Sequence, residues 1–282
     1  MLLAVTLVAI ILTAGNDNSG ELAFSSRVQV VDIEGELVDS RPVIDQLKRY
    51  EDSDSVPAIL LNIDSPGGGV AVAQEIYTEL KRLREKKHKL IVAYMSSTGA
   101  SGAYYVACGA NKIIADPGSI VGSIGVIAEW VSYQDLMAWA KLKEVVFKTG
   151  EFKDTGSATR ALTDRERTYF QGLIDDMYVQ FIDAVASGRG LDVEKVRSLA
   201  DGRVFTGRDA KTLKLIDENG NFDDAVDLTA KLAGISGRAR LIHNTRPRVT
   251  LWDLLTTTDL SRLVPFNEQT LKSEIRFQYL WK

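Results

Sequence analysis

The sequence holds few of the residues that build disulfides and metal centres. Cys108 is the single cysteine among 282 residues, which excludes an internal disulfide and a cysteine-rich metal site. The two histidines, His88 and His243, argue against a multi-histidine zinc site, so we expect neither a metal ion nor another cofactor. The net charge of −4 supplies no basic face, and we therefore expect no nucleic-acid partner.

The start of the chain has an apolar run, but this run is too short to span a membrane as a helix. The uncharged apolar stretch at residues 2–14 is shorter than the ~20 residues that a membrane-spanning helix needs. No basic residues precede it, although they normally precede the apolar part of a signal sequence. We interpret residues 1–20 as a membrane anchor or a signal segment, followed by a polar linker at 15–20. A buried strand fits less well, because the run opens the chain and a linker follows it.

The order of apolar segments predicts an α/β fold. Strand-like runs alternate with helix-like segments, and the latter carry apolar residues at helical spacing. This alternation indicates a mostly parallel sheet surrounded by helices. The nearly continuous apolar run at 57–63 indicates a strand buried on both faces. The predicted strands cover residues 28–33, 57–63, 90–95, 112–115 and 144–148, and the predicted helices cover 42–50 and 70–86.

The second half of the sequence reads as helices and turns. Thr163, followed three residues later by Glu166, forms a capping-box pattern that predicts a helix running toward Ala186. The tail at 246–282 is unusually apolar, and it could pack on a partner subunit, on a membrane or on its own core. We therefore divide the chain into an N-terminal segment (1–20), a globular body (21–245) and this tail. Shorter helices are expected near 193–199, 208–213 and 223–232.

Ser101 lies at the junction between the predicted strand at 90–95 and a helix-like run at 103–107. Its neighbours are glycines and alanines, and so bare a backbone lets another chain approach closely. A hydroxyl at the first turn of a helix also faces unpaired N–H groups and the positive end of the helix dipole. These conditions suit a nucleophile whose product is an oxyanion, although a helix-capping serine fits the same position. The loop at 67–69 also follows a strand, so we expect it to face Ser101.

A serine nucleophile needs a base within hydrogen-bond reach. His88 lies in a charged run and His243 lies beside the apolar tail, so neither has the setting of a catalytic loop. A lysine serves only when it is neutral, which burial can achieve. Lys153, in the polar loop at 150–160, is the lysine we favour. The carboxylate of Asp154 would oppose neutrality if it lay close, and a solvated loop lysine is the alternative reading.

Taken together and in order, five short motifs resemble the SppA-type signal peptide peptidases of peptidase family S49. These are membrane-attached Ser/Lys proteases with the ClpP/crotonase fold. The resemblance runs from Leu60 to Asp217 and covers well over half of the chain. The motifs are DSPGG at 64–68, ASGAYY at 100–105, GSIVGSIG at 118–125, GEFKD at 150–154 and DGRVFTG at 201–207.

This resemblance assigns roles to particular residues. It implies that Ser101 is the nucleophile, that Lys153 is its general base, and that Ser123 orients the lysine. It also implies an oxyanion hole made of the backbone N–H groups of Gly68 and Gly102. A chain with one copy of each motif resembles the single-domain form of the family, a homo-oligomeric ring or dome with its active sites at subunit contacts.

The expected function is that of a membrane-anchored serine endopeptidase that hydrolyses signal peptides or other short membrane-released peptides. The expected location is the cytoplasmic membrane, with one membrane-spanning segment and the catalytic domain on the extracytoplasmic side. Three alternatives stay open: a His-dependent hydrolase, an acyl-CoA (crotonase-type) enzyme on the same fold, and a non-catalytic membrane scaffold.

Overall fold

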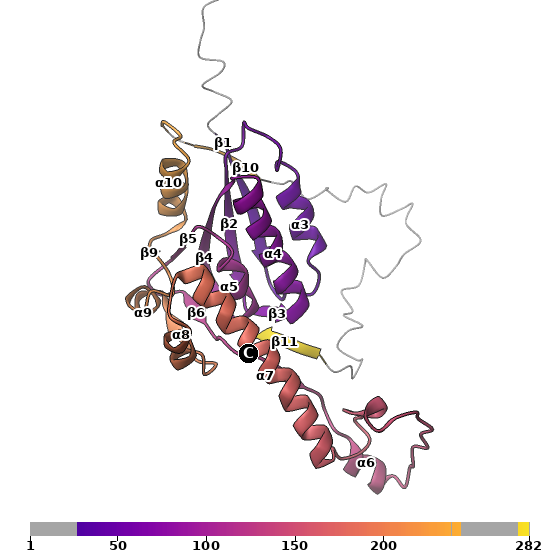
Figure 1. The fold of residues 1–282 in the computed structure, drawn as a ribbon. Helices are drawn as coiled ribbons and strands as arrows, with labels where there is room; N and C mark the ends of the chain where they lie inside the picture. The colour runs from indigo at the N-terminus through magenta and orange to yellow at the C-terminus, as the bar shows by residue number, and fades with distance from the viewer. Residues whose placement is uncertain (1–26, 238, 244–275, 282) are drawn as a thin grey trace, which may run out of the picture.

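The computed structural model describes residues 27–237, 239–243 and 276–281, and their core is a mostly parallel β-sheet (Figure 1). Its strands lie in the order β10-β1-β2-β4-β5-β9, all parallel, while β6 pairs with the end of β4 and β8 pairs antiparallel with β6. This arrangement confirms the predicted α/β architecture. The strands are β1 (Arg27–Glu34), β2 (Ala58–Ser65), β4 (Leu90–Ala100), β5 (Lys112–Ala115), β6 (Ile120–Gly122), β8 (Val204–Thr206), β9 (Glu218–Asn219) and β10 (Arg240–His243).

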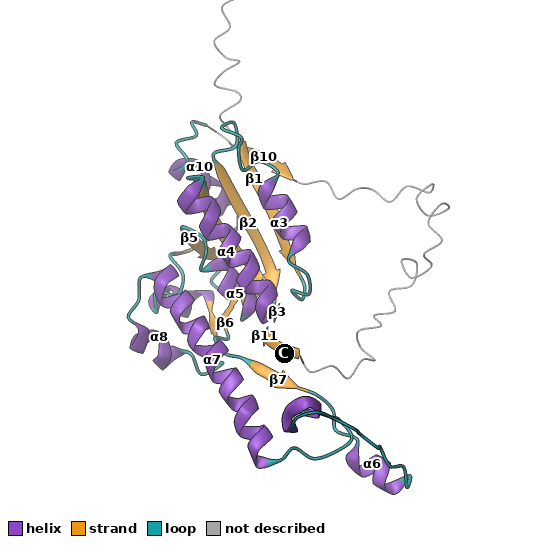
Figure 2. Ribbon diagram, turned by 45° about the vertical axis from the view of Figure 1, so that its right-hand side comes forward, coloured by secondary structure: helices purple, strands orange, loops and turns teal. Residues whose placement is uncertain are grey.

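Both faces of the sheet are buried, because apolar residues stand at consecutive positions of its central strands. In β2, Ile59 and Leu61 face one apolar cluster, and Leu60 faces the other. Helices α3 (Arg41–Lys48), α4 (Val70–Lys86), α5 (Gly102–Ala107) and the end of α7 (Asp164–Arg189) cover the first face, whereas α10 (Phe222–Leu232) covers the second (Figure 2). The predicted strands and helices of this body are confirmed apart from the strand at 144–148, and they include α8 (Val193–Leu199) and α9 (Gly207–Thr212).

Helix α7 begins at the predicted capping box. The Glu166 amide donates to Thr163 Oγ1 (3.2 Å), and the Thr163 amide donates to Glu166 Oε2 (2.9 Å). The C-terminal part of α7, around Phe181 and Val185, packs in the core, whereas its N-terminal part projects from the body. Residues 130–163, which we call the arm, lie at the projecting end (Figures 1 and 2). The arm contains α6 (Gln134–Trp139) and the short 3-10 helix η1 (Glu151–Asp154).

Two predictions were wrong. Residues 144–148 form no strand, and Phe147 is 96% exposed, because no strand in the described part of the chain pairs with this segment of the arm. The predicted single-pass location in the cytoplasmic membrane is also corrected. Of the helices in the described part of the chain, none combines the length and apolar character needed to cross a membrane. Residues 2–14, on which that prediction was based, lie outside the described residues.

The last described segment of the tail packs on the body of its own chain. Strand β11 (Arg276–Leu280) lies between β3 (Gly67–Gly69) and β7 (Ile127–Glu129) and pairs antiparallel with both. Tyr279, the fourth of its five residues, is completely buried. The tail therefore contributes a core strand beside the glycine loop, and residues 246–275 lie outside the described residues.

Candidate active site

Ser101 stands at the sharp turn between β4 and α5. Its backbone has φ 53° and ψ −119°, a conformation that costs free energy in a residue other than glycine. The turn is held by two hydrogen bonds, from the Ser101 amide to the Gly122 carbonyl (2.7 Å) and from the Tyr105 amide to the Ser101 carbonyl (2.9 Å). The Ser101 side chain caps no helix amide, so the helix-cap reading does not describe this serine. A strained strand-to-helix turn of this kind presents a hydroxyl toward a reacting group.

The amides of Gly68 and Gly102 lie next to each other beside this turn. Gly67 and Gly69 bond through their backbone to Leu37, with Leu37 N–Gly67 O at 2.8 Å and Gly69 N–Leu37 O at 2.9 Å. Since backbone groups alternate in direction along a strand, Gly68 directs its N–H to the opposite side, toward its paired residue Tyr279 in β11. A Cβ on Gly102 would lie 3.1 Å from Gly68 N. Gly68 N therefore lies beside Gly102, and the amides of two residues placed in this way form a suitable pair of donors for an oxyanion.

Ser123 shares a cavity of about 480 Å³ with Ser101. It follows β6, is buried and has φ 51°, and its amide donates to the Arg203 carbonyl (2.9 Å). The structure therefore brings together four of the five predicted site residues. The cavity is lined by Ser101, Ser123, Gly125, Val126, Ile127, Ile174, Asp175, Tyr178, Ala200, Asp201, Gly202, Leu280 and Trp281.

Strand β11 passes directly over the two glycine amides. Tyr279 is paired with Gly68, and its carbonyl oxygen lies 3.1 Å from the position of a Cβ on Gly102. The pairing continues one residue further, where the Trp281 amide donates to the Pro66 carbonyl (2.9 Å). An extended chain thus lies across the site with a peptide carbonyl at the donors.

The Tyr279 side chain fills a closed aromatic pocket. Its ring centroid lies 5.3 Å from that of Tyr105 and 4.6 Å from that of Phe181, and its hydroxyl donates to the Met177 carbonyl (2.8 Å). Burial raises the pKa of this phenol. Sequence reasoning missed this strand, although the aromatic residues at 277, 279 and 281 show the two-residue period of a strand.

Lys153 does not join this group within one chain. It lies in η1 on the arm, is exposed, and is absent from the lining of the Ser101 cavity. Its amine has no hydrogen bond or ion pair to any residue that the structure describes. The candidate nucleophile directly precedes α5, whereas the candidate base lies in η1 on the arm. Figure 1 shows α5 in the body and α6 of the arm at the projecting end of α7.

Other candidate bases also lie outside the Ser101 cavity. His88 and His243 are exposed, and neither lines the Ser101 cavity. Burial lowers the pKa of Lys89, whose amine donates to the carbonyls of Ser53 (2.6 Å) and Val56 (2.8 Å). Lys89 precedes the 11-residue strand β4 and Ser101 follows it, which separates them by roughly 35 Å.

The described residues contain neither a cluster of metal ligands nor a reactive cysteine thiol. No cluster of three or more metal-ligating side chains occurs in that part of the chain. Cys108 is buried in the core, where burial raises the pKa of its thiol to about 12. A thiol of this kind behaves as an apolar core residue.

The family is shown by comparison with known proteins. The model of peptidase family S49 matches residues 83–236, which is more than half of the chain. The chain belongs to peptidase family S49. This confirms the resemblance seen in the motifs, and the mostly parallel sheet with its surrounding helices is consistent with the ClpP/crotonase-like fold of S49 peptidases.

Similar proteins include a Synechocystis sp. protein called "Putative protease slr0021", 45% identical over 195 residues, or 69% of each chain. "Putative signal peptide peptidase SppA" of Enterococcus faecium is 33% identical over 66% of this chain and 54% of its own. "Serine protease SPPA, chloroplastic" of Arabidopsis thaliana is 30% identical over 78% of this chain and 33% of its own. The match thus spans about half of the Enterococcus relative and a third of the plant one. These similarities support a serine peptidase.

Proposed function

We propose that this S49 chain is a serine endopeptidase in which Ser101 of one copy is activated by Lys153 of another. The observation that carries the proposal is the position of a peptide carbonyl, that of Tyr279, beside the amides of Gly68 and Gly102 and next to the strained Ser101. An extended substrate bound in the same way would present its scissile carbonyl to the same donors.

The proposed chemistry uses only groups of the protein and water. The neutral Lys153 amine removes the Ser101 hydroxyl proton while the serine oxygen attacks the carbonyl carbon. The negative oxygen that results is stabilised by the two glycine amides, which contribute about 3 kcal/mol each. The ammonium then protonates the leaving amine as the C–N bond breaks. Water, deprotonated by the same lysine, hydrolyses the acyl-enzyme and restores the serine.

A second copy of the chain is the proposed source of the lysine. Lys153 is exposed and outside the Ser101 cavity of its own chain, so an exposed arm that docks on a neighbouring copy would supply it. The arm carries large apolar side chains in contact with solvent, with Trp139 81% exposed and Val145 75% exposed. Apolar surface of this extent marks an interface. A closed homo-oligomer, a ring or dome, would cover the arms of all copies.

The proposed substrates are extended peptides, among them signal peptides. Strands β3 and β7 flank β11 on both sides, and a peptide that pairs with both would gain backbone hydrogen bonds along its length. The pocket that holds Tyr279 favours a large aromatic residue at the position whose carbonyl is attacked.

The other reaction classes fit these observations less well. An acyl-CoA enzyme would use the oxyanion donors on a thioester, but it would have no use for two flanking strand edges. Labelling of Ser101 by a serine-reactive phosphonate would count against it. A His-dependent hydrolase needs His88 or His243 near the serine, and neither lines the cavity. A non-catalytic scaffold would show no turnover at all.

Mixing two inactive variants tests the proposal. Ser101→Ala and Lys153→Ala should each abolish cleavage of an unstructured fluorogenic peptide, while Ser97→Ala and Lys143→Ala, at exposed neighbouring positions, should retain it. Co-assembly of the two inactive variants should restore part of the activity, because some contacts then pair an intact Ser101 with an intact Lys153. Full activity of Lys153→Ala alone would refute the assigned base.

A further inference from the structure

The turn that carries Lys153 has little stability of its own. Helix η1 is a single 3-10 turn of four residues, and so short a helix depends on outside contacts for its conformation. Asp154 follows Lys153 directly, and an unpaired carboxylate there would attract the lysine ammonium and favour its charged form. The contacts of Asp154 therefore decide both where the lysine is held and which charge lies beside it.

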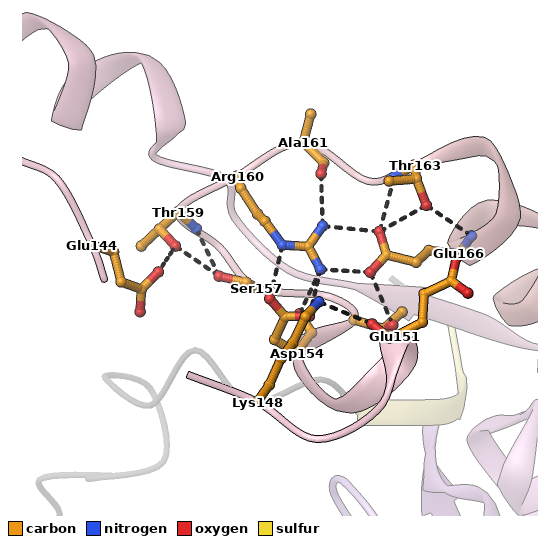
Figure 3. A network of polar contacts seen from close by, with 11 residues as sticks. Glu144, Lys148, Glu151, Asp154, Ser157, Thr159, Arg160, Ala161, Thr163 and Glu166 are labelled. Atoms are coloured by element: carbon orange, nitrogen blue, oxygen red, sulfur yellow. Dashed lines mark hydrogen bonds and ion pairs between the residues drawn. The ribbon is translucent and has the colours of Figure 1, made fainter. Parts of the chain in front are cut away.

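Asp154 is fully engaged by two cations that are not Lys153 (Figure 3). Arg160 donates to both of its carboxylate oxygens, from Nη2 to Oδ1 (2.8 Å) and from Nε to Oδ2 (3.0 Å), and the Lys148 amine also bonds to Oδ1. These partners, Arg160 first, lower the pKa of Asp154 to about 2. Arg160 Nη2 also reaches the Asp154 carbonyl (3.2 Å), so it holds the backbone of the turn as well.

The other side of the same guanidinium binds helix α7. Arg160 Nη1 donates to Glu166 Oε2 (2.9 Å), and Nη2 donates to Oε1 (2.5 Å). Glu166 is buried in the capping box of α7 and also accepts a bond from Thr155 Oγ1 (3.0 Å). A planar guanidinium with five donors can make two bidentate pairs of this kind, whereas a lysine cannot. Arg160 thus connects the turn of Lys153 to the first turn of a 26-residue helix.

We propose that Arg160 is the positioning residue of Lys153: it fastens the lysine-bearing turn to α7 and keeps the Asp154 carboxylate away from the lysine amine. The proposal rests on the assignment of Lys153 as the base. The charged groups around the turn are Lys148, Asp154, Arg160 and Glu166. The ion pair of Glu151 with Arg165 (2.8 Å) completes them.

The pH dependence of kcat/KM in the assembled full-length enzyme tests this proposal. A base that acts when neutral gives activity that rises with pH. In Arg160→Ala the Asp154 carboxylate keeps only its bond from Lys148 and can turn toward the Lys153 ammonium, which it stabilises. The acid limb of the pH profile should then move to higher pH by roughly 0.5–1.5 units, a loss of about 3- to 30-fold below the limb. The double variant Arg160→Ala/Asp154→Asn should bring the limb back to its original pH while kcat stays low, because the turn remains loose.

Arg167→Ala is the matched control, since it removes an exposed cation near the start of α7 that contacts neither Asp154 nor η1, and its limb should coincide with that of the unmodified enzyme. KM should change little in Arg160→Ala, because Arg160 does not line the Ser101 cavity. An unmoved limb in Arg160→Ala, or no restoration in the double variant, would overturn the proposal.

Circular dichroism and size-exclusion chromatography show whether Arg160→Ala folds and assembles. If it does not, Arg160→Lys is the variant that tests the proposal. It retains a charge beside Asp154 but loses the bidentate fork, so we expect an unmoved limb with a lower kcat. An unchanged kcat in Arg160→Lys would also overturn the proposal. Failure of the proposed function itself looks different, because Lys153→Ala would then remain active.

Discussion

Tyr279 lies opposite Gly68 in the antiparallel pairing of β11 with β3, although the two residues are more than 200 positions apart in the sequence. This pairing places one peptide carbonyl of the chain beside the amides expected to bind an oxyanion. The aromatic side chain of the same residue is completely buried. In the proposed function, the chain's own strand β11 thus lies where an extended substrate would bind.

Ending the chain after residue 275 should open this cleft. A tethered strand competes with substrate at a high effective concentration, so its removal should lower KM for a peptide by roughly 3- to 10-fold. The melting temperature should fall at the same time, because the aromatic contacts of Tyr279 are lost. A synthetic peptide with the sequence of residues 276–281 should inhibit the truncated enzyme competitively. Equal KM values for the two forms would show that β11 does not compete with substrate.

The aromatic pocket should govern the choice of cleavage site. Among peptides that differ only at the residue before the scissile bond, those with Tyr or Phe should be cleaved faster than the one with Ala. Tyr should exceed Phe by about 2- to 10-fold, because only Tyr can donate to the Met177 carbonyl. Mass spectrometry of the products identifies the cleaved bond. Equal rates for Ala and Tyr would rule out this pocket as the specificity site.

Substitution of Gly102 should separate activity from stability. The new Cβ in Gly102→Ala would lie 3.1 Å from Gly68 N and so would disturb the pair of amides. We expect kcat to fall by about 10²- to 10³-fold, as when one oxyanion donor is lost. Gly172→Ala is the matched control, because Gly172 is exposed in α7 with open space around its Cβ position. It should retain full activity and gain about 0.5–1 kcal/mol of stability. Normal kcat in Gly102→Ala would exclude its amide as a donor.

The parts of the fold that were predictable from sequence depend on local patterns. The β2 and β4 strands follow from continuous apolar runs, the start of α7 follows from the Thr163–Glu166 box, and each is present in the structure. The strand expected at 144–148 is absent because valine and phenylalanine favour a strand only where a neighbouring strand can pair with them. A sequence window does not show whether such a neighbour exists.

The same distinction applies to the candidate site, where the positions of some residues could be predicted from the sequence and those of others could not. Ser101, Gly68 and Ser123 lie at strand ends that a parallel sheet brings to one edge, so their proximity could be expected from topology. The position of Tyr279 depends on a pairing between distant segments, and no local pattern identifies the partner of a strand. The separation of Lys153 from Ser101 depends on the projection of α7, which is a property of the whole fold.

Acid should loosen the arm before it unfolds the body. Arg160 lowers the pKa values of both Asp154 and Glu166 in the folded state, to about 2 for Asp154. A carboxylate whose folded pKa lies below its unfolded value of about 4 adds stability that is complete above pH ~4 and is lost as the pH falls toward the folded pKa. Hydrogen exchange between pH 5 and pH 2.5 should therefore show lost protection at η1 and the first turn of α7 while β2 and β4 stay protected. In Arg160→Ala this acid-dependent loss should be weaker, because the largest cause of both lowered pKa values is removed and only Lys148 on Asp154 and the Thr163 and Thr155 bonds on Glu166 remain. Equal pH dependence of exchange in the two proteins would mean that Arg160 does not hold the arm.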